Sequence, residues 1–394
     1  MYSTTLPYVK SLDGLRGLAV LMVVFIHSRL CPFGWVGVQL FFVLSGFLIT
    51  GILLAQRTAP LKEYLGRFYW RRGLRIWPLY FVVLAVSGVG YWYSGEPATL
   101  PESWRWLVTF TYNLVRISPQ FTDSNYFGHF WTLCIEEQFY LVWPFVIFLV
   151  KPGWLLRLVV GLVLAGPLVR WLTGFGFAMI YDTPYQISRG VHNLTTSHMD
   201  AFGAGALLAL LPAGPRAWLS GRAWRIFLVT SCVTLGAGVG YSVWLWQAGA
   251  APHWLGLGYA NIDELHAYVW AYTPLNLTGA AAILCALEDT PVRKVLQLPW
   301  LAYIGRISFG LYVLHLPLLQ IFLVHWPAPY HSPQGLIRFV TFLLVACGLA
   351  SLSFHFFETR FLNLKDLLWA RKSGSHVPPP PPIALPEDAK RITP

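Results

Sequence analysis

Two ionisable side chains lie inside the first apolar segment of the chain. Arg16 begins this segment and His27 follows eleven residues later, so an α-helix places both on one face, ~16 Å apart along the axis. An ionisable group at such a depth is costly in hydrocarbon and marks a candidate functional site. An imidazole there can accept a proton or attack as a nucleophile. The alternative is a helix-starting arginine and a histidine hydrogen-bonded within the bundle.

A second candidate cluster precedes the third apolar segment, in Tyr69-Trp70-Arg71-Arg72-Gly73-Leu74-Arg75. Arg72 and Arg75 stand at positions i and i+3 of a helix and therefore point the same way. Arginine is the residue best suited to forked contacts with phosphate. These side chains predict either an anionic cytosolic ligand or simple anchoring at the membrane surface.

Two adjacent carboxylates, Glu136 and Glu137, lie inside the apolar segment that begins Trp131-Thr132-Leu133-Cys134-Ile135. Adjacent helix positions point about 100° apart, so we expect one carboxylate to face a cavity and the other to brace a neighbouring helix. Counting helix rise from the segment ends places both near the level of His27. A carboxylate beside His27 would fix the tautomer of that imidazole or stabilise its cation. His315, in Ser308-Phe309-Gly310-Leu311-Tyr312-Val313-Leu314-His315, reaches a similar level.

The elements that position these residues are membrane-spanning helices. The chain of 394 residues is 56% hydrophobic and only 11% charged, with a mean hydropathy of +0.54. Soluble domains carry about 25% charged residues, so the composition predicts an all-α, polytopic integral membrane protein. The ten predicted spans are 15–31, 36–55, 76–94, 130–150, 154–172, 198–211, 224–246, 267–287, 300–326 and 337–357. The segment 104–116 is too short to cross and is expected to be interfacial or re-entrant.

Charge placement predicts the orientation of these spans. With the N-terminus inside, most of the 28 lysines and arginines fall on the cytoplasmic side, which places both termini in the cytoplasm. The net charge of +11 therefore reflects topology and does not indicate nucleic-acid binding. Because Arg16 lies within it, the first apolar segment is expected to be a retained anchor rather than a cleaved signal peptide. The five cysteines lack CxxC spacing, so neither a disulfide framework nor a metal site is expected.

Two regions are predicted in the chain. Residues 1–366 form the transmembrane domain, and residues 367–394, with five consecutive prolines at 378–382, form a disordered cytoplasmic tail. In the second span, Ser45-Gly46 is expected to permit close helix contact. The longest outer loops, 95–129, 173–197 and 247–266, carry aromatic, histidine and asparagine side chains that suit either a sugar ring or the membrane interface.

The candidate residues sort into two layers. Arg16, Arg72 and Arg75 lie at the cytoplasmic mouth, and His27 with the carboxylates lies deeper. A basic mouth that leads to an acid–base site suits a phosphorylated cytosolic donor whose reactive end passes towards the other face of the membrane.

The sequence resembles the acyltransferase 3 family from residue 8 to about residue 362. The resemblance is carried in order by six blocks: Arg16-x10-His27, Phe41-Phe42-x-x-Ser45-Gly46, Arg72-x-x-Arg75, Trp131–Tyr140, Ser308–His315 and Phe357-Glu358. It implies transfer of an acyl group, commonly acetyl, from cytosolic acyl-CoA to a hydroxyl of a glycan, a lipid-linked sugar or a glycosylated small molecule. It also implies a catalytic role for His27, and donor-binding or otherwise essential roles for Arg16, Arg72 and Arg75.

The chain departs from the family pattern at two positions. Many members have serine where this chain has Thr132 and Cys134, which puts a role for those hydroxyl groups in doubt. Some members also carry an extracytoplasmic hydrolase-like domain. No such domain is expected here, and we expect this chain to complete the transfer itself or to hand the acyl group to a separate partner in the bacterial plasma membrane.

The expected activity is O-acyl transfer in which Glu136 or Glu137 assists His27. In a direct route His27 is the general base for the acceptor hydroxyl, and in a covalent route it carries the acyl group. The competing classes are a transporter or flippase for a glycan or lipid-linked sugar, and a non-catalytic membrane sensor. A transporter would show broken helices at matched places in its two halves, which the sequence does not indicate.

Overall fold

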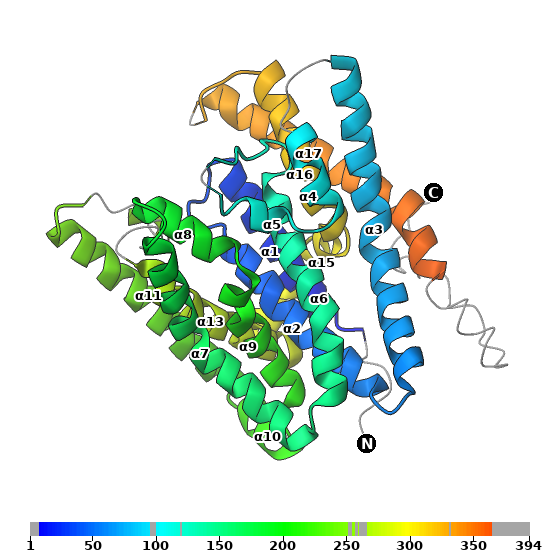
Figure 1. The fold of residues 1–394 in the computed structure, drawn as a ribbon, viewed down its shortest axis with the longest axis vertical. Coiled ribbons are helices and arrows are strands. Elements are labelled where there is room, and N and C mark those ends of the chain that lie inside the picture. The colour runs from blue at the N-terminus through cyan, green and yellow to red at the C-terminus, as the bar shows by residue number, and fades with distance from the viewer. Residues whose placement is uncertain are drawn as a thin grey trace, which may run out of the picture.

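The computed structural model describes residues 8–94, 100–118, 120–250, 254–256, 259, 266–330 and 332–364. The described part of the chain is helical and contains no β-strand (Figure 1). The α-helices are α1 (Lys10–His27), α2 (Val36–Gln56), α3 (Leu61–Ser94), α4 (Leu100–Val108), α5 (Tyr112–Val115), α6 (Trp131–Leu149), α7 (Pro152–Ala178), α8 (Pro184–Asn193), α9 (Met199–Leu210), α10 (Ala213–Ser220), α11 (Ala223–Gln247), α12 (Ala267–Trp270), α13 (Tyr272–Leu287), α14 (Pro291–Leu296), α15 (Pro299–Arg306), α16 (Ser308–His325) and α17 (Pro333–Leu352). Short 3-10 turns precede α6 (Gly128–Phe130) and α9 (Thr195–His198), and a π-helical turn, Ser353–Glu358, follows α17.

The prediction of an all-α polytopic membrane protein is confirmed. Among the described residues, eight segments are long and apolar enough to cross a bilayer: Val36–Gln56, Leu61–Gly90, Gly128–Leu149, Pro152–Ala178, Ala223–Gln247, Ala267–Leu287, Ser308–His325 and Pro333–Leu364. The other two predicted spans correspond to α1, which carries charged residues, and α9. With 12 residues, α9 rises only ~18 Å and is too short to cross the hydrocarbon core on its own.

Two predicted segments are interrupted in the structure. The segment 104–116 contains the second half of α4, a turn and the short α5. The segment 300–326 is not one helix, because α15 ends at Arg306 and α16 begins at Ser308. The break accompanies close packing against α1: a Cβ placed at Gly305 would lie 1.7 Å from the carbonyl oxygen of Asp13. Sequence periodicity does not reveal such an approach, since it depends on a helix nearly 300 residues away.

Glycines let the central helices touch backbone to backbone. Helix α2 packs along α9, where a Cβ at Gly46 would lie 2.0 Å from the carbonyl oxygen of Phe202. The reciprocal contact is made by Gly205, whose Cβ would lie 1.9 Å from the carbonyl oxygen of Val43. The expected close helix contact at Ser45-Gly46 is therefore present, and it leaves the Ser45 side chain free to face another helix.

A buried ion pair joins the helices on the other side of α9. Nη1 of Arg170 on α7 lies 2.9 Å from Oδ2 of Asp200 on α9, and both side chains are almost fully buried. The guanidinium also donates to the carbonyl oxygens of Val269 and Ser197 and to the hydroxyl of Thr273. A buried pair that is satisfied in this way fixes relative helix positions, because loss of one partner would leave an uncompensated charge.

The long helix α3 stands at the edge of the bundle (Figure 1). It carries Arg72 and Arg75 in its first half and contacts α2, α6 and α16, so it brings its arginines to the central helices from outside. The predicted tail at 367–394 lies outside the described residues, as do residues 1–7.

Candidate functional site

One cavity of about 600 Å³ is lined by the three arginines that the sequence identified as candidates. Arg16 comes from α1, and Arg72 and Arg75 come from α3. Two further arginines line the same space: Arg71, from α3, and Arg216, from α10. The cavity is therefore strongly basic, and its arginines come from three separate helices.

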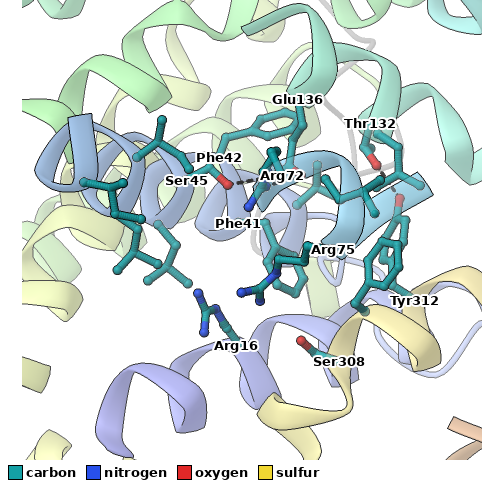
Figure 2. Close-up of a pocket in the computed structure, with 18 residues that line it drawn as sticks. Arg16, Phe41, Phe42, Ser45, Arg72, Arg75, Thr132, Glu136, Ser308 and Tyr312 are labelled. Carbon is teal, nitrogen blue, oxygen red and sulfur yellow. Dashed lines mark hydrogen bonds and ion pairs between the residues drawn. The ribbon is translucent and has the colours of Figure 1, made fainter. Parts of the chain in front are cut away.

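A narrower cavity of about 170 Å³ adjoins the first one, because the two share the side chains of Arg16, Leu48, Ile49, Ile52, Arg72 and Arg75. Figure 2 shows the guanidinium groups of Arg16, Arg72 and Arg75 directed into this common space. The far end of the narrow cavity is lined by Thr132 and Tyr312. A wide basic space thus leads into a narrow, mainly apolar one.

A neighbouring carboxylate forms an ion pair with one of these arginines. Nη1 of Arg16 donates to Oδ1 of Asp13 at 3.0 Å, one helical turn earlier. By contrast, Arg75 makes no hydrogen bond or ion pair within the described part of the chain, and its side chain is exposed to the cavities that it lines. Arg75 is therefore available to an anionic ligand without losing a protein partner.

Glu136 lines the narrow cavity and belongs to a network with Arg72. Oε1 of Glu136 accepts a hydrogen bond of 2.7 Å from the Ser45 hydroxyl, and Oε2 lies 3.9 Å from Nη2 of Arg72. Tyr140 completes the network: its hydroxyl donates to Ser45 at 3.0 Å and accepts from Arg72, whose guanidinium carbon lies 3.9 Å from the tyrosine ring centre. Glu136 thereby fixes the position of Arg72 between α2, α3 and α6.

Glu137 points to a different neighbour. Its Oε2 accepts a hydrogen bond of 3.2 Å from the Trp77 indole of α3, and Oε1 has no hydrogen-bond partner among the described residues. This arrangement matches the expectation that one carboxylate faces a cavity while the other braces a neighbouring helix.

His27 lies at the last residue of α1 and belongs to neither cavity lining. Its Nδ1 atom lies 2.8 Å from the carbonyl oxygen of Val23 and 3.2 Å from Nε2 of His315 on α16. The sequence led us to expect a carboxylate of Glu136 or Glu137 beside this imidazole. In the described structure neither glutamate forms an ion pair or hydrogen bond with His27, because α6 directs Glu136 towards α2 and Glu137 towards α3.

A third histidine joins the pair. The ring centre of His129 lies 4.6 Å from that of His315 and 6.2 Å from that of His27. His129 is almost fully buried, and neither ring nitrogen has a hydrogen-bond partner in the described part of the chain. Sequence reasoning missed His129, although it stands two residues before the Trp131–Tyr140 block.

Tyr312 separates the histidine cluster (His27, His129 and His315) from the narrow cavity. Its hydroxyl donates to the carbonyl oxygen of His129 at 2.7 Å and is also hydrogen-bonded to Thr132 (Figure 2). Its ring centre lies 5.2 Å from that of His129 and 5.6 Å from that of His315. The cluster therefore lies directly behind the wall that closes the cavity, and Thr132 retains a hydroxyl contact at this wall.

The structure thus brings Arg16, Arg72, Arg75 and Glu136 to one pair of cavities, and places His27 with two other histidines instead. Arg216 was also missed from the sequence, because a single arginine near a span end looks like any other cytoplasmic basic residue. Over the residues that the structure describes, no group of three or more His, Cys, Asp or Glu side chains is arranged to hold a metal ion.

Comparison with known proteins identifies the family. A family model described as an acyltransferase domain matches residues 9–355. The chain is 26% identical to the peptidoglycan O-acetyltransferase OatA of Listeria monocytogenes, over 89% of this chain and 55% of that protein. It is 26% identical to the putative peptidoglycan O-acetyltransferase YrhL of Bacillus subtilis, over 89% of this chain and 54% of that protein. It is 25% identical to the O-acetyltransferase OatA of Staphylococcus aureus, over 91% of this chain and 58% of that protein.

The chain spans a little over half the length of these curated relatives. No solved structure matches it. The family match covers the helices that supply both cavities and the histidine cluster. The chain belongs to the acyltransferase 3 family and is a multi-pass membrane protein.

Proposed function

We propose that this protein is an O-acyltransferase that takes an acyl group, namely acetyl, from cytosolic acyl-CoA. The acceptor is a hydroxyl of a glycan, a lipid-linked sugar or a glycosylated small molecule. The acetyl group and the carbohydrate acceptor are suggested by the names of the relatives, which are O-acetyltransferases and, for two of them, peptidoglycan O-acetyltransferases. The observation that carries the proposal is the pair of adjoining cavities lined by Arg16, Arg72 and Arg75.

The shape and charge of these cavities suit acyl-CoA. Its phosphates need several cationic donors, which the wide cavity supplies from α1, α3 and α10. Its pantetheine arm is narrow and only mildly polar, and the adjoining cavity offers the apolar side chains of Leu48, Ile49 and Ile52. The thioester at the end of the arm then approaches Thr132 and Tyr312, and it meets His27 behind them only when the Tyr312 side chain moves aside. The basic residues lie at the end of the bundle predicted to be cytoplasmic, so the donor enters from the cytosol.

In the direct route, His27 is the general base. Its Nδ1 faces Val23 and His315, which leaves Nε2 without a hydrogen-bond partner in the described structure. Nε2 takes the proton of the acceptor hydroxyl as the alkoxide oxygen attacks the thioester carbon. The carbon–sulfur bond breaks, the thiolate of CoA leaves, and the proton held by His27 returns to that sulfur.

In the covalent route, the same Nε2 lone pair attacks the thioester and releases the CoA thiolate. The resulting acyl-imidazolium, which keeps its hydrogen on Nδ1, passes its acyl group to the acceptor hydroxyl. The hydroxyl proton goes to Nε2 of the departing imidazole and from there to the CoA thiolate. Both routes require the neutral form of His27 with its lone pair on Nε2. In either case the acceptor reaches His27 from the end of the bundle opposite the basic cavity, in a bacterial plasma membrane. The chain either completes the transfer itself or hands the acyl group to a separate extracytoplasmic partner.

The test uses the purified chain in liposomes with radiolabelled acetyl-CoA and a carbohydrate acceptor. We expect release of CoA and transfer of label that depend on His27. His27→Gln cannot carry the proton, so its turnover should fall by roughly 10²–10⁴-fold while acetyl-CoA still binds. Arg72→Lys with Arg75→Lys should instead weaken donor binding, because lysine lacks the forked geometry. A wild-type protein that neither binds acetyl-CoA nor releases CoA would overturn the proposal.

A further inference from the structure

The contact between His27 and His315 determines where each ring carries its hydrogen. His315 lies on α16, is completely buried, and directs Nε2 at Nδ1 of His27 across 3.2 Å. Two imidazole nitrogens at this distance attract each other only if one is a donor and the other is an acceptor. The neighbouring carbonyl groups decide which is which.

Both carbonyl contacts lead to the same assignment. The carbonyl oxygen of Val23 can only accept, so Nδ1 of His27, 2.8 Å away, carries the hydrogen. The carbonyl oxygen of Tyr312 lies 2.7 Å from Nδ1 of His315, so that nitrogen is protonated as well. In neutral His315 the lone pair then falls on Nε2, the atom that faces His27. The lone pair of neutral His27 correspondingly falls on its own Nε2.

We infer that His315 is a positioning residue for acyl transfer: it accepts a hydrogen bond from Nδ1–H of His27 and so keeps the reactive lone pair of His27 on Nε2. This inference rests on the proposed role of His27. The same acceptor serves throughout the reaction, because Nδ1–H is present in neutral His27, in its imidazolium and in the acyl-imidazolium formed when Nε2 is acylated. No side chain has to turn between these states.

The frame around His315 supports this role. Tyr312, one turn earlier on α16, anchors that helix to the carbonyl oxygen of His129 at 2.7 Å and to Thr132 on α6. This anchor fixes His315 relative to α6, and the contact with His27 then ties α16 to the end of α1. A histidine that ends a helix without such support has only the carbonyl of its own helix to hold its tautomer.

The chain contains a matched control on the same helix. His325 ends α16 as His27 ends α1, and its Nδ1 lies 2.9 Å from the carbonyl oxygen of Ile321, four residues earlier. A bond to the carbonyl four residues back is therefore a common feature of histidines in these helices. What distinguishes His27 is the buried second acceptor supplied by His315.

The test compares His315→Gln, His315→Phe and His325→Phe, each as the full chain in liposomes with acetyl-CoA and acceptor. The Gln amide oxygen occupies the place of Nε2 and can still accept, whereas Phe fills the space without an acceptor. We expect His315→Phe to lower kcat by about 10- to 100-fold at unchanged acetyl-CoA affinity. The kcat of His315→Gln should remain within about threefold of the wild-type value, and that of His325→Phe should equal it. A merely space-filling role predicts the reverse order of the two His315 variants.

A second readout needs no turnover. Nitrogen-15 spectra of ring-labelled histidines, with the His27 signal assigned by its loss in His27→Gln, should give an unprotonated Nε2 for His27 in the wild type and a mixture of tautomers in His315→Phe. A wild-type His27 signal with protonated Nε2 overturns the inference even if the Phe variant does not fold. Wild-type turnover in a folded His315→Phe protein also overturns it, while the effect of His27→Gln then still upholds the proposed function. A wild type without CoA release overturns the proposed function, and the tautomer remains measurable.

Discussion

The hydroxyl of Ser45 donates a hydrogen bond of 2.7 Å to Oε1 of Glu136, which ties α2 to α6 at the wall of the narrow cavity. The other carboxylate oxygen faces Arg72 at 3.9 Å, so Glu136 is a partner of Arg72 and not of His27. Its expected contribution is therefore to donor binding, through the position of the Arg72 guanidinium.

A double-mutant cycle on acetyl-CoA affinity tests this assignment. Arg72→Gln and Glu136→Gln should be non-additive by about 0.5–3 kcal/mol, because each variant removes the partner of the other. The cycle of Glu136→Gln with His27→Gln should be additive within about 0.5 kcal/mol, since these two side chains share no contact. Calorimetric titration of the purified proteins provides the affinities. If the coupling energy of Glu136 with His27 were as large as that with Arg72, Glu136 would act on the imidazole, and this assignment would be wrong.

Arg216 provides a test of how the donor lies in the wide cavity. Its guanidinium caps the end of α9 through the carbonyl oxygen of Ala209, 2.9 Å away, and lines the cavity at its α10 side. If it meets the nucleotide end of the donor, Arg216→Ala should weaken acetyl-CoA binding about tenfold, equivalent to about 1.4 kcal/mol. Binding of an acetyl-pantetheine fragment, which lacks the nucleotide, should not change.

Arg222→Ala is the matched control for that experiment. Arg222 donates to the carbonyl oxygen of Trp218 near the same short helix and does not line either cavity. We expect this variant to bind acetyl-CoA like the wild type. Equal losses in the Arg216 and Arg222 variants would indicate a general effect of surface charge.

The sidedness of the cavities can be tested by chemical labelling. A cysteine at Lys62, which is exposed at the start of α3, should react with a membrane-impermeant maleimide only from the cytoplasm. A cysteine at Gln120, exposed between α5 and α6, should react only from outside. The five native cysteines, of which Cys232 is exposed, are replaced first. Labelling of position 62 from outside would place the basic cavity on the wrong face for a cytosolic donor.

The glycine contacts predict a stability difference between two conservative substitutions. Gly46→Ala would place a methyl group 2.0 Å from the Phe202 carbonyl oxygen, so α2 and α9 must separate at a cost of about 1–3 kcal/mol. Gly236→Ala on α11 meets no atom within 4 Å and replaces glycine with a better helix former. Thermal unfolding in detergent should therefore give a lower Tm for the first variant and an unchanged or higher Tm for the second. A Tm for Gly46→Ala at or above that of the wild type would mean that the two helices are not tightly packed.

Much of the fold could be predicted from local sequence. Span locations follow from runs of apolar residues, because hydrocarbon thickness sets the length of a crossing helix. The divergence of Glu136 and Glu137 follows from helix periodicity, and the structure places them against α2 and α3 accordingly. The grouping of Arg72 with Arg75 has the same origin, since a separation of three residues returns to one face of a helix.

The partners of these residues depend on how the helices pack. His27 meets His315, 288 residues further along the chain, and Arg216 on α10 joins arginines of α1 and α3 in one cavity. The sequence does indicate depth along the membrane normal, and it predicts similar levels for His27 and the glutamates. It does not specify the direction in which each side chain points within the membrane plane. That direction is decided by backbone contacts such as those of Gly46 with Phe202 and Gly305 with Asp13, because they set the rotation and spacing of neighbouring helices.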